Sequence, residues 1–544
     1  MRANWKKSGT ESYRQIMRLA LPIVIQGLFS AAISSTDVIM LNSVGQSAVS
    51  AVSLAAQYSG VLYMVYYGLG TGATMLCAQY WGQGNPDAIE KVEGIALRFS
   101  FGISLLFAIP AMTIPRLMMT LFTSDQELIA IGSSYLRIIS ISYLCWGFSE
   151  VYLSVLRSVE RVKVSTALNV STLLVNVCLN AVFVYGLFGA PRLGAQGVAL
   201  ATSIARGLEL IACFAVSIFS DRKSRRTQKS GSAQEGIAAN DFAQERRGAV
   251  NDRIQSGRAH EERGAANGRT QESFAANGRA QESRAVNVHA GKAGAANAPS
   301  QGDRLRQVAG NAVRLRPDAM FWKSGVLMPD FLRLSVPALA NDIIWSVGFS
   351  MYSVIMGHMG TDVVAANAIV VVVRNFGTVL CYSIASAAGI FVGKEIGANQ
   401  FEEAKRDASR SMHLTVAAGI FGGVLVAVAA PFVLSAVSLT DTARGYLKIM
   451  LLINTYYIMG SAVNTTLIAG IFRAGGDSRF GLICDTIDMW CYAVPLGFLA
   501  AFAIKLPPMW VYFLLCTDEF VKWPWVLHHY RSRKWLKNIT REDV

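Results

Sequence analysis

Charged side chains are scarce in this sequence of 544 residues. Asp, Glu, Lys and Arg make up 16% of it, whereas hydrophobic residues make up 52%; soluble domains usually contain about 25% charged residues. The shortage excludes an ordinary soluble domain, because apolar segments of roughly 20 residues are long enough to cross a bilayer. We therefore expect a protein that crosses the lipid bilayer several times.

Cysteine and histidine are also few, and their spacing suggests no metal or redox site. The eight cysteines stand singly inside apolar stretches and are interpreted as small buried hydrophobic residues. The six histidines lie mainly in loops and near the C-terminus, and no His/Asp, Ser/His or Cys/His set falls at membrane depth. A polytopic membrane enzyme is therefore a disfavoured alternative, and we expect no cofactor.

Apolar segments long enough to span the bilayer recur along the chain. We count twelve, centred at about residues 29, 65, 105, 140, 175, 208, 343, 378, 422, 457, 491 and 518. Lys and Arg gather in one set of connections, including "RSVERVK", "KRDASR" and the tail "HHYRSRKWLK". Because positive loops mark the cytoplasmic side, we expect a multi-pass protein of the inner (plasma) membrane with both termini in the cytoplasm.

An internal repeat relates the two halves of the chain. "RLALP" at 18–22 recurs as "RLSVP" at 333–337, and at the same offset Gly45 falls on Gly360 and Gly82 on Gly397. Further along, Arg157 falls on Arg473. Each copy holds six spans, so the copies have the same orientation in the membrane. The fold class that we predict is an all-α polytopic membrane protein with twelve transmembrane helices in two six-helix bundles.

The segment between the halves has a different composition. We divide the chain into an N-terminal lobe (1–220), a linker (221–322) and a C-terminal lobe (323–544). The linker contains "AANGRTQESF" and "AANGRAQESR", has few large apolar side chains, and is predicted to be disordered and cytoplasmic. A tether for anionic lipid or RNA is the alternative, which its interleaved Glu residues weaken; we expect no nucleic-acid partner.

Polar residues inside the predicted spans are the candidates for function, because such residues usually line a cavity. In the first half they are Gln26, Asp37, Asn176, Asn180 and Thr202. Asn176 and Asn180 are four residues apart and share one helical face. Together with Asp37 and Thr202 they offer oxygen ligands for a small cation, or an aspartate that holds a proton; polar packing between helices is the alternative.

The second half offers a comparable set. Pro22 and Pro337 occupy equivalent positions, where each removes a backbone hydrogen bond and is expected to act as a hinge. The polar and aromatic candidates that follow Pro337 are Asn341, Asp342, Trp345, Asp485 and Asp488. Asp485 lies close to the cytoplasmic end, and pairing with Arg473 or Arg479 is the alternative to a role in a substrate cavity.

Taken together, these motifs resemble the multidrug and toxic compound extrusion (MATE) family, prokaryotic type. The resemblance rests on the two "RLxxP" starts, "GQGNPDAIEK", "GANQFEEAKR", "YGLFGAPRLGAQGVALAT" and "FRAGGDSRF", and it covers both halves. It implies a secondary antiporter that expels cationic or amphiphilic drugs in exchange for Na⁺ or H⁺, with a cation site at Asp37, Asn176, Asn180 and Thr202. Small organic cations and the lipid bilayer would be its partners, and we expect a monomer.

The chain departs from the family pattern at two points. Position 180 is Asn where many relatives carry a second aspartate, and "GSAVNTTLIAG" lacks an acid that some relatives have there. A site in the second half would therefore rest on Asp342, Asp485 or Asp488. A lipid-linked oligosaccharide flippase of the same superfamily is the alternative function; its pyrophosphate cargo calls for basic residues in the cavity, whereas the mid-span charges that we identify are acidic.

Overall fold

The computed structural model describes residues 9–219, 321–322, 325–437 and 439–541. At residues 9, 34, 35, 37–39, 42 and 46 it describes the backbone alone. The predicted linker at 221–322 lies outside the described residues apart from its last two. Below, "first half" means residues 9–219 and "second half" means residues 325–541.

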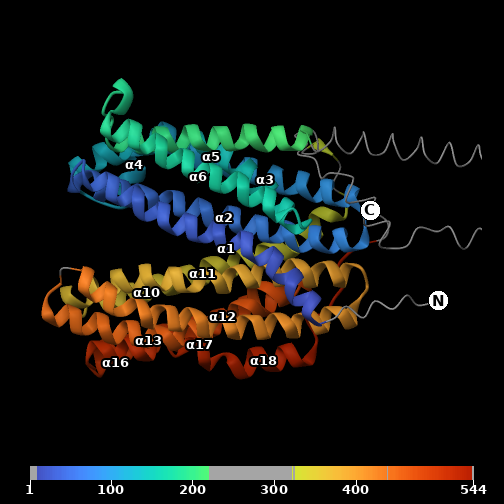
Figure 1. Cartoon of the computed structure of the whole chain (residues 1–544). Coiled ribbons are helices and arrows are strands. Elements are labelled where there is room, and N and C mark those ends of the chain that lie inside the picture. The colour runs from blue at the N-terminus through green and yellow to red at the C-terminus, as the bar shows by residue number, and fades with distance from the viewer. Residues whose placement is uncertain (1–8, 220–320, 323–324, 438, 542–544) are drawn as a thin grey trace, which may run out of the picture. The chain divides into compact units, whose positions relative to one another are not determined.

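The first half consists of long helices joined by short turns (Figure 1). They are α1 (Gly9–Asn42), α2 (Gln46–Gln83), α3 (Pro86–Thr113), α4 (Pro115–Thr120), α5 (Gln126–Ser158), α6 (Val162–Tyr185), the short turn η1 (Leu187–Gly189) and a final helix at Ala195–Phe219. Within this half α2 and α3 pack on α5, and α1 packs on α6.

The second half repeats this order with more interruptions. Its elements are α10 (Leu327–Gly357), α11 (Thr361–Gly397), α12 (Phe401–Ala436), α13 (Asp441–Thr465), η3 (Thr466–Phe472), α14 (Ser478–Ile487), η4 (Asp488–Ala493), α15 (Val494–Phe498), η5 (Leu499–Ala503), α16 (Pro508–Leu515), α17 (Asp518–Val521) and α18 (Trp523–Ser532). The segments η3, η4 and η5 are π-helical.

Ten helices of the described residues are long and apolar enough to cross a membrane. The two other predicted spans, centred at about residues 457 and 518, correspond to α13 with η3 and to the broken series α16 to α18. Large apolar side chains such as Leu106 on α3 and Phe432 on α12 are exposed, as a lipid-facing surface requires. The prediction of an all-α, twelve-span membrane protein is confirmed.

The connection between α2 and α3 shows how the sequence ends one helix and starts the next. Gly84 ends α2 in the left-handed region (φ 81°), which costs glycine little. The side chain of Asn85 then accepts a hydrogen bond from the backbone N–H of Ala88, and Pro86 occupies the first turn of α3. In the second half, Asn399 adopts a positive φ of 58° at the corresponding turn between α11 and α12.

The glycines that the repeat aligns make the closest approach between the halves. A Cβ on Gly82 of α2 would overlap the backbone oxygen of Lys394 on α11, and a Cβ on Gly397 would overlap that of Gln79. The two helix ends therefore touch backbone to backbone. We call this side of the bundle, formed by the C-terminal ends of α2 and α11, the terminal end.

The C-terminal segment strengthens the contact at the terminal end. The side chain of Gln79 donates to the backbone oxygens of Ala474 and Lys537 and accepts from the N–H of Ile539. Across the same end, Lys394 lies 2.7 Å from Glu160, which joins the α5–α6 connection to α11. The two halves are therefore held together at this end by backbone contact, an ion pair and the tail.

We predict that Gly397→Ala destabilises the protein and that Gly102→Ala does not. The added methyl group at position 397 forces α2 and α11 apart, which typically costs about 1–3 kcal/mol, whereas a Cβ at position 102 meets nothing within 4 Å. Thermal unfolding of the purified variants measures the difference. Equal melting temperatures for the two variants would show that the glycine contact is absent.

Candidate functional site

A cavity of about 730 Å³ lies between the two halves. Aromatic rings from both halves line it, among them Tyr63 and Tyr67 of α2, Trp146 of α5 and Tyr382 of α11. Tyr63 stacks on Trp146 with ring centroids 5.7 Å apart. Such faces suit an amphiphilic molecule and attract cations. We call this space the central cavity.

Arginines also line the central cavity, and on the first-half wall each has an acidic partner. Arg157 donates to Glu150 at 3.2 Å and to the Ser154 hydroxyl at 2.7 Å. Arg206 donates to Glu209 at 2.8 Å, and its guanidinium lies 4.8 Å from the ring centroid of Trp146. This wall therefore carries positive and negative charge in adjacent pairs.

The predicted cation set of the first half is partly visible. Asn176 on α6 donates to the Thr202 hydroxyl at 3.0 Å, and Asn180 donates to Asn176 Oδ1 at 3.2 Å. The structure thus brings these three side chains together, with Asn176 and Asn180 buried and Thr202 half-buried. Asp37 belongs to α1, which packs against α6, but its side chain lies outside the described residues. Its predicted role stays a prediction.

The two prolines predicted as hinges, and the amide side chains one turn after them, lie at equivalent positions of α1 and α10. Pro22 and Pro337 each lie inside a continuous helix. Gln26 lines the central cavity, and its Oε1 is buried with no hydrogen-bond donor among the described residues. Asn341 is buried, and its Oδ1 also accepts no hydrogen bond from any described residue.

A second cavity of about 410 Å³ adjoins the central one and shares Tyr63, Tyr67, Tyr382 and Arg473 with it. We call it the side cavity. Four of the predicted cavity residues line it: Asn341, Asp342, Trp345 and Asp485.

An ion pair between the half-buried Asp342 and the buried Arg473 lies at the boundary of the two cavities. Asp342 accepts two hydrogen bonds from Arg473, at 2.6 and 3.3 Å. The alternative in which Asp485 pairs with Arg473 or Arg479 is therefore wrong. Asp342 on α10 already occupies Arg473, and the basic partner of Asp485 is Lys522, at 3.3 Å.

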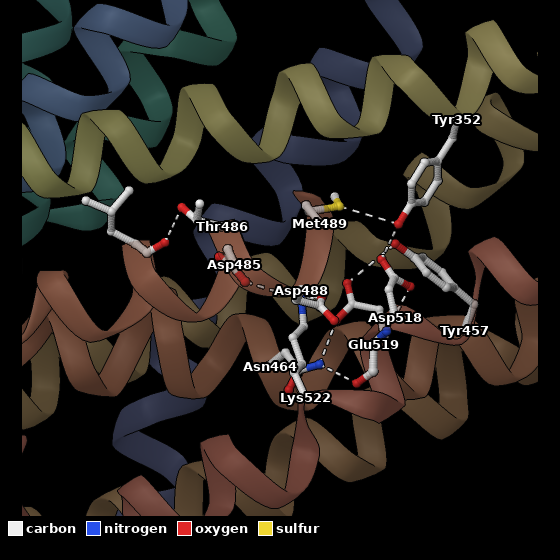
Figure 2. A network of polar contacts seen from close by, with 11 residues as sticks. Tyr352, Tyr457, Asn464, Asp485, Thr486, Asp488, Met489, Asp518, Glu519 and Lys522 are labelled. Carbon is white, nitrogen blue, oxygen red and sulfur yellow. Dashed lines mark hydrogen bonds and ion pairs between the residues drawn. The ribbon is translucent and has the colours of Figure 1, made fainter. Parts of the chain in front are cut away.

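Lys522 is the centre of a buried group of acids that Figure 2 shows. Its ammonium lies 3.3 Å from each of Asp485, Asp488 and Glu519, and Asp518 is the neighbour of Glu519 on α17. We call Asp485, Asp488, Asp518, Glu519 and Lys522 the acidic cluster. Asp485, Glu519 and Lys522 reach the side cavity, whereas Asp488 is not among its lining residues.

Several of these residues escaped the sequence analysis, although the signal was present. Asp518, Glu519 and Lys522 fall within the twelfth predicted span, and Arg206 falls within the sixth. The cost of charge at membrane depth, applied to basic as well as acidic residues, would have identified them. The statement that mid-span charges are acidic is wrong, because Arg206 and the buried Arg374 of α11 also lie within spans.

Comparison with known proteins identifies the family. A model of the MatE family matches residues 22–182 and 337–499, which make up more than half of the chain. The chain belongs to the MATE family. The two matched blocks begin at Pro22 and Pro337, the aligned prolines of the internal repeat. This MATE protein is a transporter and not an enzyme.

Curated relatives of this MATE protein are distant. It is 19% identical over 538 residues to the uncharacterized transporter YisQ of Bacillus subtilis, covering 98% of this chain and 97% of YisQ. It is 22% identical to the probable multidrug resistance protein YoeA of the same organism, and the match covers 92% of this chain and 89% of YoeA. To the probable multidrug resistance protein NorM of Bradyrhizobium diazoefficiens it is 28% identical, over 38% of this chain and 44% of NorM.

Solved structures show the same fold. One of them is a transporter of the MOP superfamily from Pyrococcus furiosus, which is described as having a binding pocket of reverse polarity that suggests a different function. It matches with a TM-score of 0.72 at 14% sequence identity, and the match covers 96% of this chain and 97% of that one. A mutant of the Vibrio cholerae MATE transporter VcmN matches with a TM-score of 0.70 at 14% sequence identity, and the match covers 97% of this chain and 99% of that one.

We predict that Asp342→Asn destabilises this protein far more than Asp330→Asn. Both acids bind an arginine through two contacts, but Arg473 is buried, whereas the Arg541 side chain that pairs with Asp330 is 43% exposed. Loss of one partner from a buried pair costs about 3–5 kcal/mol, whereas an exposed pair contributes about 0–1 kcal/mol. Thermal unfolding compares the two variants, and similar losses would contradict the burial of the Asp342–Arg473 pair.

Proposed function

We propose that this MATE protein exports cationic or amphiphilic organic compounds in exchange for Na⁺ or H⁺. The observation that carries the proposal is the central cavity, which lies between the halves and presents aromatic rings beside the carboxylate of Glu150. Aromatic faces and carboxylates together favour organic cations with apolar bodies. Relatives named as probable multidrug resistance proteins support the same substrate class.

The closed terminal end supports transport by alternating access. In our proposal the protein lies in the plasma membrane with both termini in the cytoplasm, so the terminal end is the cytoplasmic side. The contact of Gly82 and Gly397 with the opposite helix, the Lys394–Glu160 ion pair and the C-terminal segment then block the cytoplasmic route. Rocking of the halves about the central cavity would break these contacts and open that route.

The contact between α6 and the helix at Ala195–Phe219 supports our proposal of a coupling site in the first half. We propose that Asp37, Asn176, Asn180 and Thr202 bind the coupling cation, and that Pro22 lets α1 bend when the site is occupied. Asn176 already donates a hydrogen bond to Thr202, and Asn180 donates one to Asn176. Because ion occupancy changes the charge of Asp37, occupancy and lobe conformation are thermodynamically linked.

A lipid-linked oligosaccharide flippase is the second candidate, because Arg157, Arg206 and Arg473 line the central cavity. A pyrophosphate group would bind such guanidinium groups. Each of the three arginines, however, is already paired with a carboxylate, namely Glu150, Glu209 and Asp342. This pairing leaves no excess of positive charge on the cavity wall and favours the drug exporter.

The proposed function predicts dye transport driven by an ion gradient. Proteoliposomes that hold the purified protein are loaded with ethidium and given either a Na⁺ gradient or a pH gradient. We expect one of the two gradients to accelerate dye movement relative to liposomes without protein. Absence of dye movement under both gradients, together with movement of a labelled lipid-linked oligosaccharide, would replace the drug exporter with the flippase.

A variant of Asp37 tests the first-half coupling site. We predict that Asp37→Asn lowers gradient-driven dye efflux by roughly 5- to 150-fold, the range of typical coupling energies, but leaves downhill dye exchange intact. Asp125→Asn is the matched control, because Asp125 caps α5 and Asn caps equally well. Unchanged gradient-driven efflux in the Asp37 variant would remove this residue from coupling.

A further inference from the structure

The acidic cluster has an unusual charge balance for its depth. Asp485 and Asp488 are 5% exposed, Glu519 is 3% exposed and Asp518 is fully buried, while Lys522 is 4% exposed. Four carboxylates thus share one ammonium group inside the protein. Because ionised groups are costly to bury without a partner, the cluster cannot remain fully ionised without further neutralisation.

The acids differ in how they are partnered (Figure 2). Glu519 accepts from the Asn464 amide at 2.6 Å and lies 3.3 Å from Lys522. Asp518 accepts from the Tyr352 hydroxyl at 2.8 Å and from the N–H of Glu519, and no described basic side chain forms an ion pair with it. Hydroxyl and amide donors stabilise a carboxylate but add no positive charge.

Asp488 and Asn464 supply a separate observation. Lys522 lies within ion-pair distance of Asp488 Oδ2, but Oδ1 is buried and accepts no hydrogen bond from any described residue. The same holds for Asn464 Oδ1, on a side chain that is 3% exposed. Both oxygens are acceptors that lack a donor, and a buried acceptor without a donor costs about 1–3 kcal/mol. A proton placed on the cluster would supply one.

The groups around the cluster do not restore the balance. Those that interact electrostatically with the cluster or with its immediate neighbours are Asp342, Tyr352, Arg374, Tyr382, Tyr456, Tyr457, Arg473, Cys484, Tyr512 and Cys516. Asp342 and Arg473 neutralise each other. Arg374, whose guanidinium lies 4.3 Å from the Phe349 ring centroid, adds one positive charge. Four acids against Lys522 and Arg374 leave two negative charges.

The local backbone and the neighbouring cavity both indicate that the acidic cluster has a functional role. The π-helical segment η4 begins at Asp488, and π-helical turns occur frequently at functional sites. The side cavity contacts Asp485, Glu519 and Lys522 and shares six lining residues with the central cavity. A proton or a substrate in the central cavity therefore has a route to the cluster.

We propose that the acidic cluster is a proton-binding site in the second half of this MATE protein, and that protons and cationic substrates compete for its negative charge. The bound species is a proton rather than a metal ion, because the Lys522 ammonium already occupies the position between Asp485, Asp488 and Glu519. Uptake converts one carboxylate and one proton from solvent into a carboxylic acid. This inference rests on the proposed export function.

Competition at the cluster gives antiport a physical basis. When the cluster is deprotonated, the side cavity is negative and attracts the charged end of an organic cation. When the cluster takes up protons, its excess negative charge is neutralised, and the side cavity no longer attracts the cation. Because each ligand weakens the other by the same factor, proton binding and substrate binding are reciprocal.

Infrared spectroscopy of the purified protein tests proton binding without any transport assay. Protonated carboxylic acids have a carbonyl stretching band that carboxylates lack. We expect this band near neutral pH, its loss as the pH is raised to about 9, and a weaker band in Asp488→Asn and in Glu519→Gln. Asp407→Asn, which changes an equally buried acid that has its own partner Arg410, should leave the band unchanged.

The wild-type titration remains decisive even where a variant fails to fold. No carbonyl band at any pH between about 5 and 9 would overturn the proposal, as would a band of full intensity in the Asp488 and Glu519 variants. These outcomes do not depend on whether the protein exports dyes, so this inference and the proposed function can fail separately.

Transport by the same variants tests the coupling. In proteoliposomes we expect Asp488→Asn to lower dye efflux driven by a pH gradient by roughly 5- to 150-fold. Lys522→Met removes positive charge and should shift the pH profile of efflux to higher pH, whereas Lys522→Arg should restore it. Efflux that is driven by Na⁺ at constant pH and abolished by Asp488→Asn would show that the cluster binds a metal cation, which contradicts the proposal.

Discussion

A charge buried in a membrane bundle must be paired or neutralised, and the charged residues of this protein are arranged by that requirement. Asp342 binds Arg473, Glu150 binds Arg157, and Glu209 binds Arg206, one acid to one base each. Around Lys522 the ratio is four acids to one base. The first arrangement is electrically balanced, whereas the second has an excess of acids that further binding must neutralise.

The internal repeat shows that the two halves differ at this site. The alignment that places Arg157 on Arg473 also places Asn169 on Asp485 and Thr172 on Asp488. The first half thus has neutral polar groups at two positions where the second half has acids. Asn169 lines the central cavity, and Asp485 lines the side cavity. Two halves with the same fold accordingly offer different electrostatic environments to a substrate that lies between them.

Much of the fold follows from local sequence, but the pairing of side chains does not. Composition and turn residues predict the length of the spans and the turn at Gly84 and Asn85. The internal repeat predicts the correspondence of Gly82 with Gly397. The partner of Asp485 could not be predicted, because Lys522 lies 37 residues away on another helix and only helix packing decides between it and Arg473. Arg206, Arg374 and Lys522, by contrast, could have been predicted, because each falls inside a predicted span, where a charged side chain is costly unless it is paired.

The central claim is that substrate leaves in exchange for protons that bind in the second half. The most direct test uses proteoliposomes with equal Na⁺ concentrations on both sides and several fixed pH gradients. The measured quantity is the dye concentration gradient at which the net flux of dye stops. We expect this balance point to move steadily with the pH gradient while the Na⁺ concentrations stay equal. A balance point that stays at equal dye concentrations for every pH gradient would contradict it.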